Sequence, residues 1–387
     1  MSNFSNFEQG FNEDICFVFS WLSESSDSWS GTPKGLYDAL NKKIGVKRLN
    51  VGAKKNDVIN RYIKKILSPT SEYSHAKKII NNDENINYNI PYLVFGEYNT
   101  KVVNHTFCYQ DLTIDYSIGM LKNKALNYSV LHKLKNSIVL YSLKRKQKEA
   151  ARFYQNCAGI FTMSNWLKCY MVQNMGICEN KVHHVGGGCS VDVSLIDATR
   201  KTGNKFLFVG KDWQRKNGDL VVNAFEKLSE LYPEMEPELY IAGPVSPPPS
   251  VIKKKGIHFL GLLPYNELAQ YYNLCDYFVM PSNFEPYGLV FVEALIFGLP
   301  CIGKDCYAMP EFIQDGENGY LIQDNDVDQL VRAMKKLLLN GSTISDFVKK
   351  KHDFYVNEYS WDSVANRILK VMKKDGFDVA NSFDSKE

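Results

Sequence analysis

The stretch "MPSNFEPYGLVFVEALIFGLPCIG", residues 280–303, places two glutamates, Glu285 and Glu293, within an otherwise apolar run. The residues just before it, "DYFV", are typical of a buried strand, and "PSNFEPYG" is rich in turn-forming residues. "LVFVEALIF" fits a helix, which "GLP" ends with a glycine followed by a proline. The sequence therefore predicts that Glu285 lies in a strand-to-helix loop and that Glu293 lies on the helix after it.

Carboxylates in such apolar surroundings need partners. In open α/β sheets, ligands bind beyond the carboxyl ends of the strands, where this loop is expected. Glu285 and Glu293 can accept hydrogen bonds from a hydroxylated ligand there, and the backbone N–H groups of Gly288 and Leu289 can receive an anion at the positive end of the helix dipole. The pattern favours a ligand with hydroxyls and phosphates. A purely structural role, with Glu285 favouring the helix start and Glu293 reaching the surface, stays open.

A second candidate segment is "FVGKDWQRKNGDLVVNAF", residues 208–225. Its cations Lys211, Arg215 and Lys216 follow a strand-like run, with no neighbouring acid cluster that would hold magnesium. Arginine and lysine in such a loop can neutralise a diphosphate directly, which indicates a metal-independent phosphate site. Basic residues in a surface loop are also often only solvated, so this segment alone does not decide the function.

Strand-like runs followed by helix-like patterns recur along the chain and predict an α/β fold with parallel sheets. The pattern restarts at "FLFVG" after the polar stretch "DATRKTGN", so we place a linker near residue 200. The 387 residues then divide into two Rossmann-like domains, 1–198 and 199–360. The helix expected at Trp361–Lys374 is followed by a polar tail.

Composition excludes several classes of protein. Hydrophobic residues make up 44% and charged residues 23% of the sequence, as in a soluble globular protein. The nine cysteines have no spacing typical of a zinc site and are expected to be reduced thiols, with no metal. The first residues lack the pattern of a signal peptide, and the longest apolar run is too short to span a membrane. We expect a cytoplasmic location.

Positive charge is concentrated in the first half of the chain. Residues 1–200 hold 25 Lys and Arg against 17 Asp and Glu. The stretch Lys122–Lys148 is basic and partly amphipathic, which fits either solvated helix faces or peripheral contact with anionic lipid at the inner membrane face. No zinc finger, RNA-recognition signature or arginine-rich arm is found, so no nucleic-acid partner is expected.

The strand-ending "FVG" with "WQRKNG", then "HFLGLLPYNELAQYYNLCDYFVMPS" and "NFEPYGLVFVEALIFGLPCIG", together resemble the retaining glycosyltransferases of family 4. The hallmark of that family is a Glu-x7-Glu motif, which Glu285 and Glu293 match. The resemblance covers nearly all of residues 150–370. It implies the GT-B fold, in which two Rossmann-like domains face each other across a cleft, with 1–198 binding the acceptor, 199–360 binding the donor, and residues 361–387 joining the first domain.

The resemblance also implies roles for individual residues. Glu285 would contact the donor sugar, Glu293 the ribose, and Arg215 with Lys216 the diphosphate. Many relatives have Arg directly after "VG", where this chain has Lys211, and here Asn217 separates Lys216 from the glycine. Asp111, at the end of a predicted strand, stands where relatives have a His or Asp near the reacting sugar. Gly31 resembles their glycine-rich loop facing the donor, and residues 261–263 are expected near the base.

The function so implied is metal-independent transfer of a hexose, with retention, from a UDP- or GDP-sugar to a hydroxyl of a glycan or lipid-linked acceptor, in polysaccharide, lipopolysaccharide or glycolipid synthesis. No cofactor is expected. The alternative is a non-catalytic protein of the same fold that binds nucleotide sugar or stabilises another transferase. A nucleotide-sugar epimerase or a phosphorylase on the same fold is a weaker third possibility. A phosphorylase would require a pyridoxal-binding lysine, and no motif identifies one. A dinucleotide-binding enzyme is disfavoured, because Gly186-Gly187-Gly188 lacks the Gly-x-Gly-x-x-Gly order.

Overall fold

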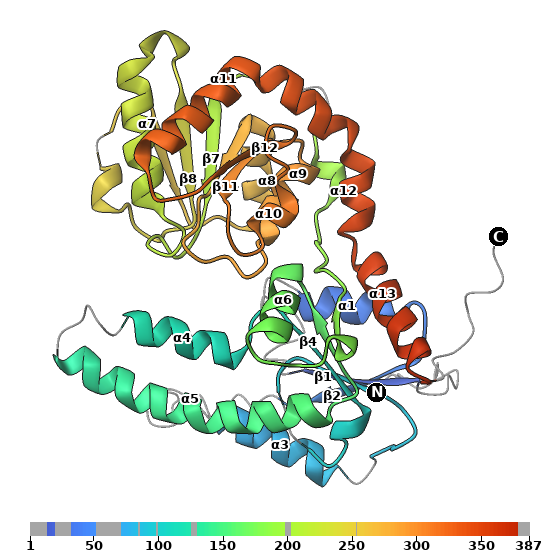
Figure 1. Cartoon of the computed structure of the whole chain (residues 1–387). Coiled ribbons are helices and arrows are strands. Elements are labelled where there is room, and N and C mark those ends of the chain that lie inside the picture. Colours follow the sequence, from blue (N-terminus) through green and yellow to red (C-terminus); the bar gives the residue numbers. More distant parts are fainter. Residues whose placement is uncertain are drawn as a thin grey trace, which may run out of the picture. The chain divides into compact units, whose positions relative to one another are not determined.

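The computed structural model describes residues 14–19, 32–51, 71–83, 86–97, 100–124, 130–197, 203–252 and 254–377. The chain divides into two compact units. The first contains residues up to 163, 168–188 and those from 364 onward, and the second contains 164–167 and 189–363. Each unit is a parallel-sheet α/β domain, as the alternation of strand-like and helix-like runs predicts (Figure 1).

The first unit is built on a six-stranded sheet in the order β2-β1-β3-β4-β5-β6, with each described pair parallel. Strand β1 is fully buried, which matches the unbroken apolar run "ICFVF". The chain order of the elements is β1 (Ile15–Phe19), α1 (Thr32–Asn41), β2 (Val46–Asn50), α3 (Ser71–Asn82), β3 (Tyr92–Val94), β4 (Thr106–Gln110), α4 (Ile114–Lys124), α5 (Val130–Asn156), β5 (Gly159–Thr162), α6 (Asn165–Gln173) and β6 (Val182–His184).

The second unit has its own six-stranded parallel sheet, in the order β12-β11-β10-β7-β8-β9. Its elements are β7 (Lys205–Val209), α7 (Gly218–Leu231), β8 (Glu238–Ala242), β9 (Ile257–Gly261), α8 (Tyr265–Leu274), β10 (Tyr277–Val279), α9 (Leu289–Ile296), β11 (Cys301–Lys304), α10 (Met309–Phe312), β12 (Gly319–Ile322), α11 (Val327–Lys350) and α12 (His352–Glu358). Strands β7 to β9 extend the sheet in one direction and β10 to β12 in the other.

This strand order locates the ligand site before any side chain is considered. The order is that of a doubly wound Rossmann sheet, and the direction reverses between β7 and β10. Loops leaving the carboxyl ends of two such neighbouring strands diverge and leave a crevice, where ligands of this fold bind. The loops after β7 and β10 carry the cations and Glu285 that the sequence singles out.

The last helix, α13 (Trp361–Lys374), has the bounds expected from sequence. The first three residues of this helix belong to the second unit, and the helix belongs to the first unit from Val364 onward. On the first-unit side, the Arg367 guanidinium donates to the carbonyl of Val185 at 2.7 Å. The main passage of the chain into the second unit follows Gly188, whereas the sequence placed the linker near residue 200.

Strand β10 is held in the second unit by a tyrosine that reaches a helix. Tyr277 is 1% exposed, and its hydroxyl donates to the carbonyl of Gly203 at 3.2 Å. The same hydroxyl fills the space beside Gly341 of α11, where a Cβ would lie 1.9 Å from the oxygen. The glycine in this helix is therefore explained by packing and not by backbone conformation.

We expect Gly341→Ala to lower the free energy of unfolding, although alanine favours a helix by about 1 kcal/mol over glycine. The clash with the Tyr277 hydroxyl should outweigh that gain, because overpacking typically costs about 1–3 kcal/mol. The control is Tyr277→Leu, which removes the hydroxyl and also the ring atoms that would lie 2.6 and 2.7 Å from the same Cβ. Urea unfolding should show that Gly341→Ala is much less harmful in the Tyr277→Leu background, and equal effects in both backgrounds would contradict this explanation.

Candidate functional site

The site is formed by two loops, which leave the sheet where the strand order reverses. The loop after β7 runs from Gly210 to Asn217 and ends at the first residue of α7. The loop after β10 runs from Met280 to Gly288 and ends at α9. The predicted binding residues Arg215, Lys216 and Glu285 lie on these loops, and the structure brings all three together.

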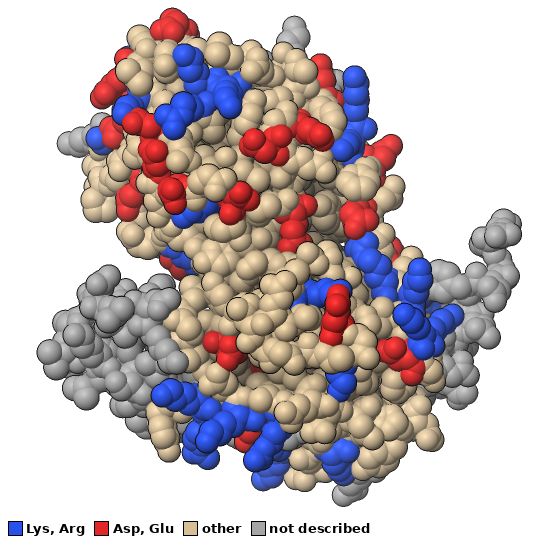
Figure 2. Space-filling view, in the orientation of Figure 1, with Lys and Arg blue, Asp and Glu red and all other residues tan. Residues whose placement is uncertain are grey.

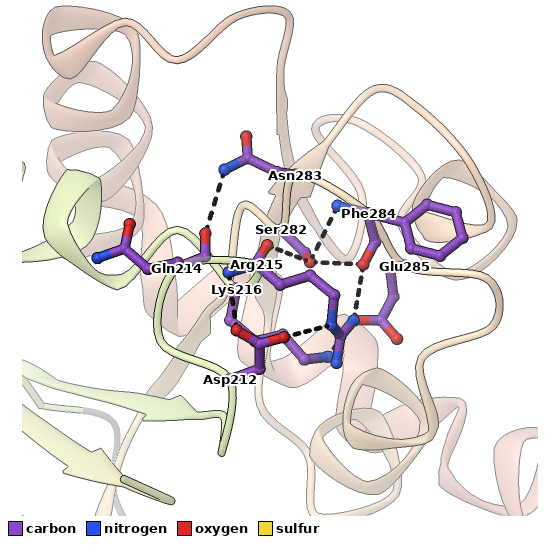
Figure 3. A network of polar contacts seen from close by, with 8 residues as sticks. All are labelled: Asp212, Gln214, Arg215, Lys216, Ser282, Asn283, Phe284 and Glu285. Atoms are coloured by element: carbon purple, nitrogen blue, oxygen red, sulfur yellow. Dashed lines mark hydrogen bonds and ion pairs between the residues drawn. The ribbon is translucent and has the colours of Figure 1, made fainter. Parts of the chain in front are cut away.

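Backbone and side-chain hydrogen bonds join the two loops into one structure (Figure 3). The carbonyl of Arg215 accepts the N–H of Asn283 at 2.8 Å and lies 3.1 Å from the Ser282 hydroxyl. In return, the Arg215 guanidinium donates to the carbonyl of Phe284 at 2.7 Å. Asp212 supports the arginine, because its carboxylate lies 3.4 Å from Nε. The cationic loop therefore cannot move without disturbing the loop that carries Glu285.

Lys216 and Glu285 form a buried ion pair at the centre of this structure. Lys216 is 7% exposed and Glu285 6% exposed, and the lysine Nζ donates to Oε2 of the glutamate. Arg215 Nη1 lies 3.6 Å from the same oxygen. Burial lowers the pKa of Lys216, and the negative charge of Glu285 opposes that shift. The Glu285 carboxylate thus faces two cations, Arg215 and Lys216, at the crevice.

Glycines make room for this pair. A Cβ on Gly210 would lie 2.8 Å from Cγ of Lys216, so the strand end must be glycine for the lysine to fold back over it. Gly288 has φ of 105°, a conformation that favours glycine, and a Cβ there would lie 3.0 Å from Cγ of Glu285. Gly288 is also the N-cap residue, directly before α9. The N–H groups of Leu289 and Val290 in the first turn have no acceptor within the helix, as at any helix start.

Glu293 lies on α9, partly exposed, and is held by a residue of α8. The Tyr272 hydroxyl donates to Oε2 of Glu293 at 2.9 Å. Burial raises the pKa of Glu293, while the hydrogen bond from Tyr272 and the positive charge of Lys216 oppose this rise. The carboxylate is therefore kept in surroundings that disfavour its charge, which is unusual for a residue with only a structural role.

In the first unit, Asp111 directly follows β4, at the carboxyl end of the strand. Its charge raises the pKa of the buried Tyr109, after the larger effect of burial itself. The Tyr109 hydroxyl donates to the carbonyl of Gly186 at 2.9 Å. Gly31 lies outside the described residues. The roles proposed for Asp111 and Gly31 stay predictions.

Sequence reasoning missed the residues that brace the site. Asn217 has φ of 63°, which asparagine tolerates better than most residues. Its side-chain amide donates to Asn325 at 2.8 Å, and Asn325 in turn donates to Asn283 at 2.9 Å. The departure from the lysine-glycine pair of many relatives therefore adds a residue that connects three loops. In the sequence, the only sign of this role is that Asn217 stands between Lys216 and Gly218.

Two further observations concern metals and membranes. Among the described residues, no group of three or more His, Cys, Asp and Glu side chains could hold a metal ion. No helix in the described part of the chain is long and apolar enough to cross a membrane.

Part of the chain is similar to a known protein family. Residues 196–354 match the family described as glycosyl transferases group 1. That region contains both loops of the site and the helix that carries Glu293. The match to that family therefore covers most of the second unit.

Two curated relatives are similar to parts of this chain. The chain is 27% identical over 210 residues to an uncharacterized 41.2 kDa protein in the cps region of Klebsiella pneumoniae, covering 51% of this chain and 56% of that protein. It is 26% identical over 259 residues to an uncharacterized glycosyltransferase of Methanocaldococcus jannaschii, covering 60% and 65%. The chain spans less than two thirds of the length of these relatives.

Solved structures show that the fold extends through both units. Sucrose-phosphate synthase from Thermosynechococcus elongatus superposes with a TM-score of 0.64 at 14% identity, over 94% of this chain and 99% of that one. WaaG, a glycosyltransferase involved in lipopolysaccharide biosynthesis, gives 0.62 at 14% identity, over 92% and 99%. The pneumococcal O-GlcNAc transferase GtfA, in complex with UDP and GlcNAc, gives 0.54 at 15% identity, over 78% and 60%. These likenesses show that the two units have the GT-B fold.

The raised pKa of Glu293 predicts a pH-dependent cost to stability. A carboxyl whose pKa is higher in the folded than in the unfolded protein binds more protons when the protein is folded. The free energy of unfolding therefore falls as the pH rises above the pKa of glutamate in the unfolded protein, about 4.3. Glu293→Gln removes the charge and keeps an oxygen for Tyr272. We expect the variant to gain in melting temperature over the parent at pH 7 and to show a smaller gain near pH 4. A pH-independent difference would contradict this.

Proposed function

We propose that the protein is a retaining glycosyltransferase of family 4, which transfers a hexose from a UDP- or GDP-sugar to an acceptor hydroxyl without a metal ion. Arg215, Lys216 and the N-terminus of α9, at Gly288 and Leu289, bind the diphosphate. Glu285 orients the sugar and Glu293 binds the ribose. The second unit is the donor domain and the first unit binds the acceptor. Asp111 of the first unit acts near the reacting sugar, and Gly31 belongs to a loop that faces the donor.

One observation carries the proposal: two cations meet the buried Glu285, beside Gly288 at the start of α9, at the switch point of a doubly wound sheet. Anions bind at such helix starts, and charge-assisted hydrogen bonds from arginine and lysine are strong. A diphosphate supplies the negative charge that these groups select, and a sugar supplies hydroxyls for the carboxylate. The UDP in GtfA, a neighbour of the same fold, supports a nucleotide ligand.

The proposed reaction breaks the bond between the sugar C1 and the leaving phosphate oxygen and forms a bond between C1 and the acceptor oxygen on the same face. Negative charge grows on the leaving diphosphate, where Arg215, Lys216 and the helix N-terminus stabilise it. The leaving phosphate oxygen takes the acceptor proton, so no separate strong base is required. Glu285 holds the sugar so that C1 and the acceptor oxygen meet in a productive orientation.

The acceptor is a glycan or lipid-linked glycan of a surface polysaccharide, lipopolysaccharide or glycolipid. Two relatives support this choice, the protein in the cps region and WaaG, which is involved in lipopolysaccharide biosynthesis. Figure 2 shows Lys and Arg side chains gathered over α5 of the first unit, and exposed Lys144, Arg145, Lys148 and Arg152 belong to this helix. Anionic lipid headgroups attract such a surface. We place the protein in the cytoplasm, with peripheral contact at the inner membrane face.

Nucleotide binding tests the donor site. UDP or GDP at 100 times its dissociation constant should stabilise the protein by about 2.7 kcal/mol, seen as a rise in melting temperature. The rise should persist in EDTA and disappear in Arg215→Ala combined with Lys216→Ala, each variant being compared with its own ligand-free melting temperature. Lys211→Ala is the matched control, because Lys211 is an exposed cation of the same loop. No shift with any nucleotide would contradict the proposal.

Glu285→Gln tests the catalytic role. Loss of the orienting carboxylate should lower kcat about a hundredfold, the scale expected when a reacting group is misplaced. Release of nucleotide that depends on acceptor separates transfer from the non-catalytic alternative. Glu226→Gln, which alters only a surface ion pair with Lys254, serves as the control. Unchanged turnover in a folded Glu285→Gln protein would refute the assignment.

A further inference from the structure

Resting on the proposed function, we propose that Tyr272 is a positioning residue for donor binding. It holds Oε2 of Glu293 in a hydrogen bond, which leaves Oε1 as the oxygen available to the ribose hydroxyls. Neither the sequence motif nor the comparisons assign Tyr272 a role. It reaches Glu293 from α8, a different element from the one that carries the glutamate.

The geometry leaves the hydroxyl little freedom. Tyr272 is 0% exposed, and its ring stacks on Phe297 with centroids 5.1 Å apart. A second ring, Phe278 of strand β10, lies 6.4 Å away. Because these rings fix the plane of the tyrosine, its oxygen lies at a defined point 2.9 Å from Oε2 of Glu293. A side chain held by packing in this way can orient a ligand-binding group.

The chemistry matches the geometry. Burial, and after it the charge of Glu293, raise the pKa of Tyr272 well above its ordinary value, so the tyrosine stays a hydrogen-bond donor. Burial raises the pKa of Glu293, and the bond from Tyr272 is the largest of the effects that lower it. A donor bonded to a carboxylate favours the ionised form, which is the better acceptor for ribose hydroxyls. Tyr272 therefore both orients the carboxylate and favours its ionised form.

The other titratable groups that face Glu293 come from three segments. Cys189, at the start of the second unit, and Tyr265 of α8 both have a raised pKa, each caused first by burial and then by the charge of Glu293. Both therefore stay neutral at weakly acid pH. Lys216 supplies the nearby positive charge, and it is already paired with Glu285. Tyr272 is the group among these that donates directly to Glu293.

The test is Tyr272→Phe, which keeps the packed ring and removes the oxygen. The matched control is Tyr271→Phe, the same change at the neighbouring residue of α8, whose ring lies 6.0 Å from that of Tyr240. We expect Tyr272→Phe to raise the dissociation constant for UDP or GDP, whichever binds the parent, and the donor KM at least tenfold, with kcat at saturating donor changed by less than twofold. Tyr271→Phe should change neither.

Two readouts separate positioning from a general loss of stability. In the Glu293→Gln background, Tyr272→Phe should weaken nucleotide binding less than in the parent, because the charged acceptor is gone. The pH below which nucleotide affinity falls should rise in Tyr272→Phe, since Glu293 then protonates more readily. A purely structural tyrosine would lower the melting temperature and move neither quantity.

The outcomes also separate this inference from the proposed function. If the parent protein binds neither UDP nor GDP, the proposed function fails and this inference fails with it. If the parent binds and Tyr272→Phe binds equally well with an unchanged pH profile, Tyr272 has no positioning role and the proposed function stands. Equal loss in the Tyr271→Phe control would also overturn the inference, because the effect would then come from α8 as a whole.

Discussion

The buried pair of Lys216 and Glu285 is the constraint on which the second unit depends. Removing one partner of a buried ion pair costs about 3–5 kcal/mol, because the other charge is left without compensation. The two partners come from different halves of the doubly wound sheet, the lysine from the loop after β7 and the glutamate from the loop after β10. Gly210 and Gly288 provide the space that the pair needs. The strand order brings the two loops together, and the two glycines leave room for the side chains, so each of these features allows Lys216 and Glu285 to pair.

The site also keeps groups that lower stability. Glu293 carries a raised pKa in a helix that is otherwise almost entirely apolar, and an uncharged residue would fold there at less cost. Functional sites commonly retain such groups, since the surroundings that disfavour a charge also strengthen its interaction with a ligand. The hydrogen bond from Tyr272 reduces this loss of stability, because it gives the Glu293 carboxylate a partner.

Much of the fold and part of the site could be predicted from the sequence. Apolar runs with turn residues after them mark the parallel strands, and breakers around Glu285 place it in a loop, where the structure has it. Tyr272 could not be found this way, because its partner lies on another helix and only the folded unit brings them together. The same holds for Asn325, which meets Asn217 across two loops. The chain passes into the second unit after Gly188, whereas polar composition marks a later stretch as the linker.

The hydrogen bonds that join the two loops have a consequence for how substrate binding energy can be used. Arg215 donates to the carbonyl of Phe284, next to Glu285, so a ligand that draws the guanidinium toward itself also acts on the backbone before the glutamate. In the proposed function, attraction of the diphosphate by Arg215 is transmitted through this hydrogen bond to the backbone beside Glu285, which orients the sugar. Energy gained from parts of a substrate remote from the reacting bond can be used to orient that bond. The proposed donor nucleotide would then help to orient the reacting bond, in addition to its part in recognition.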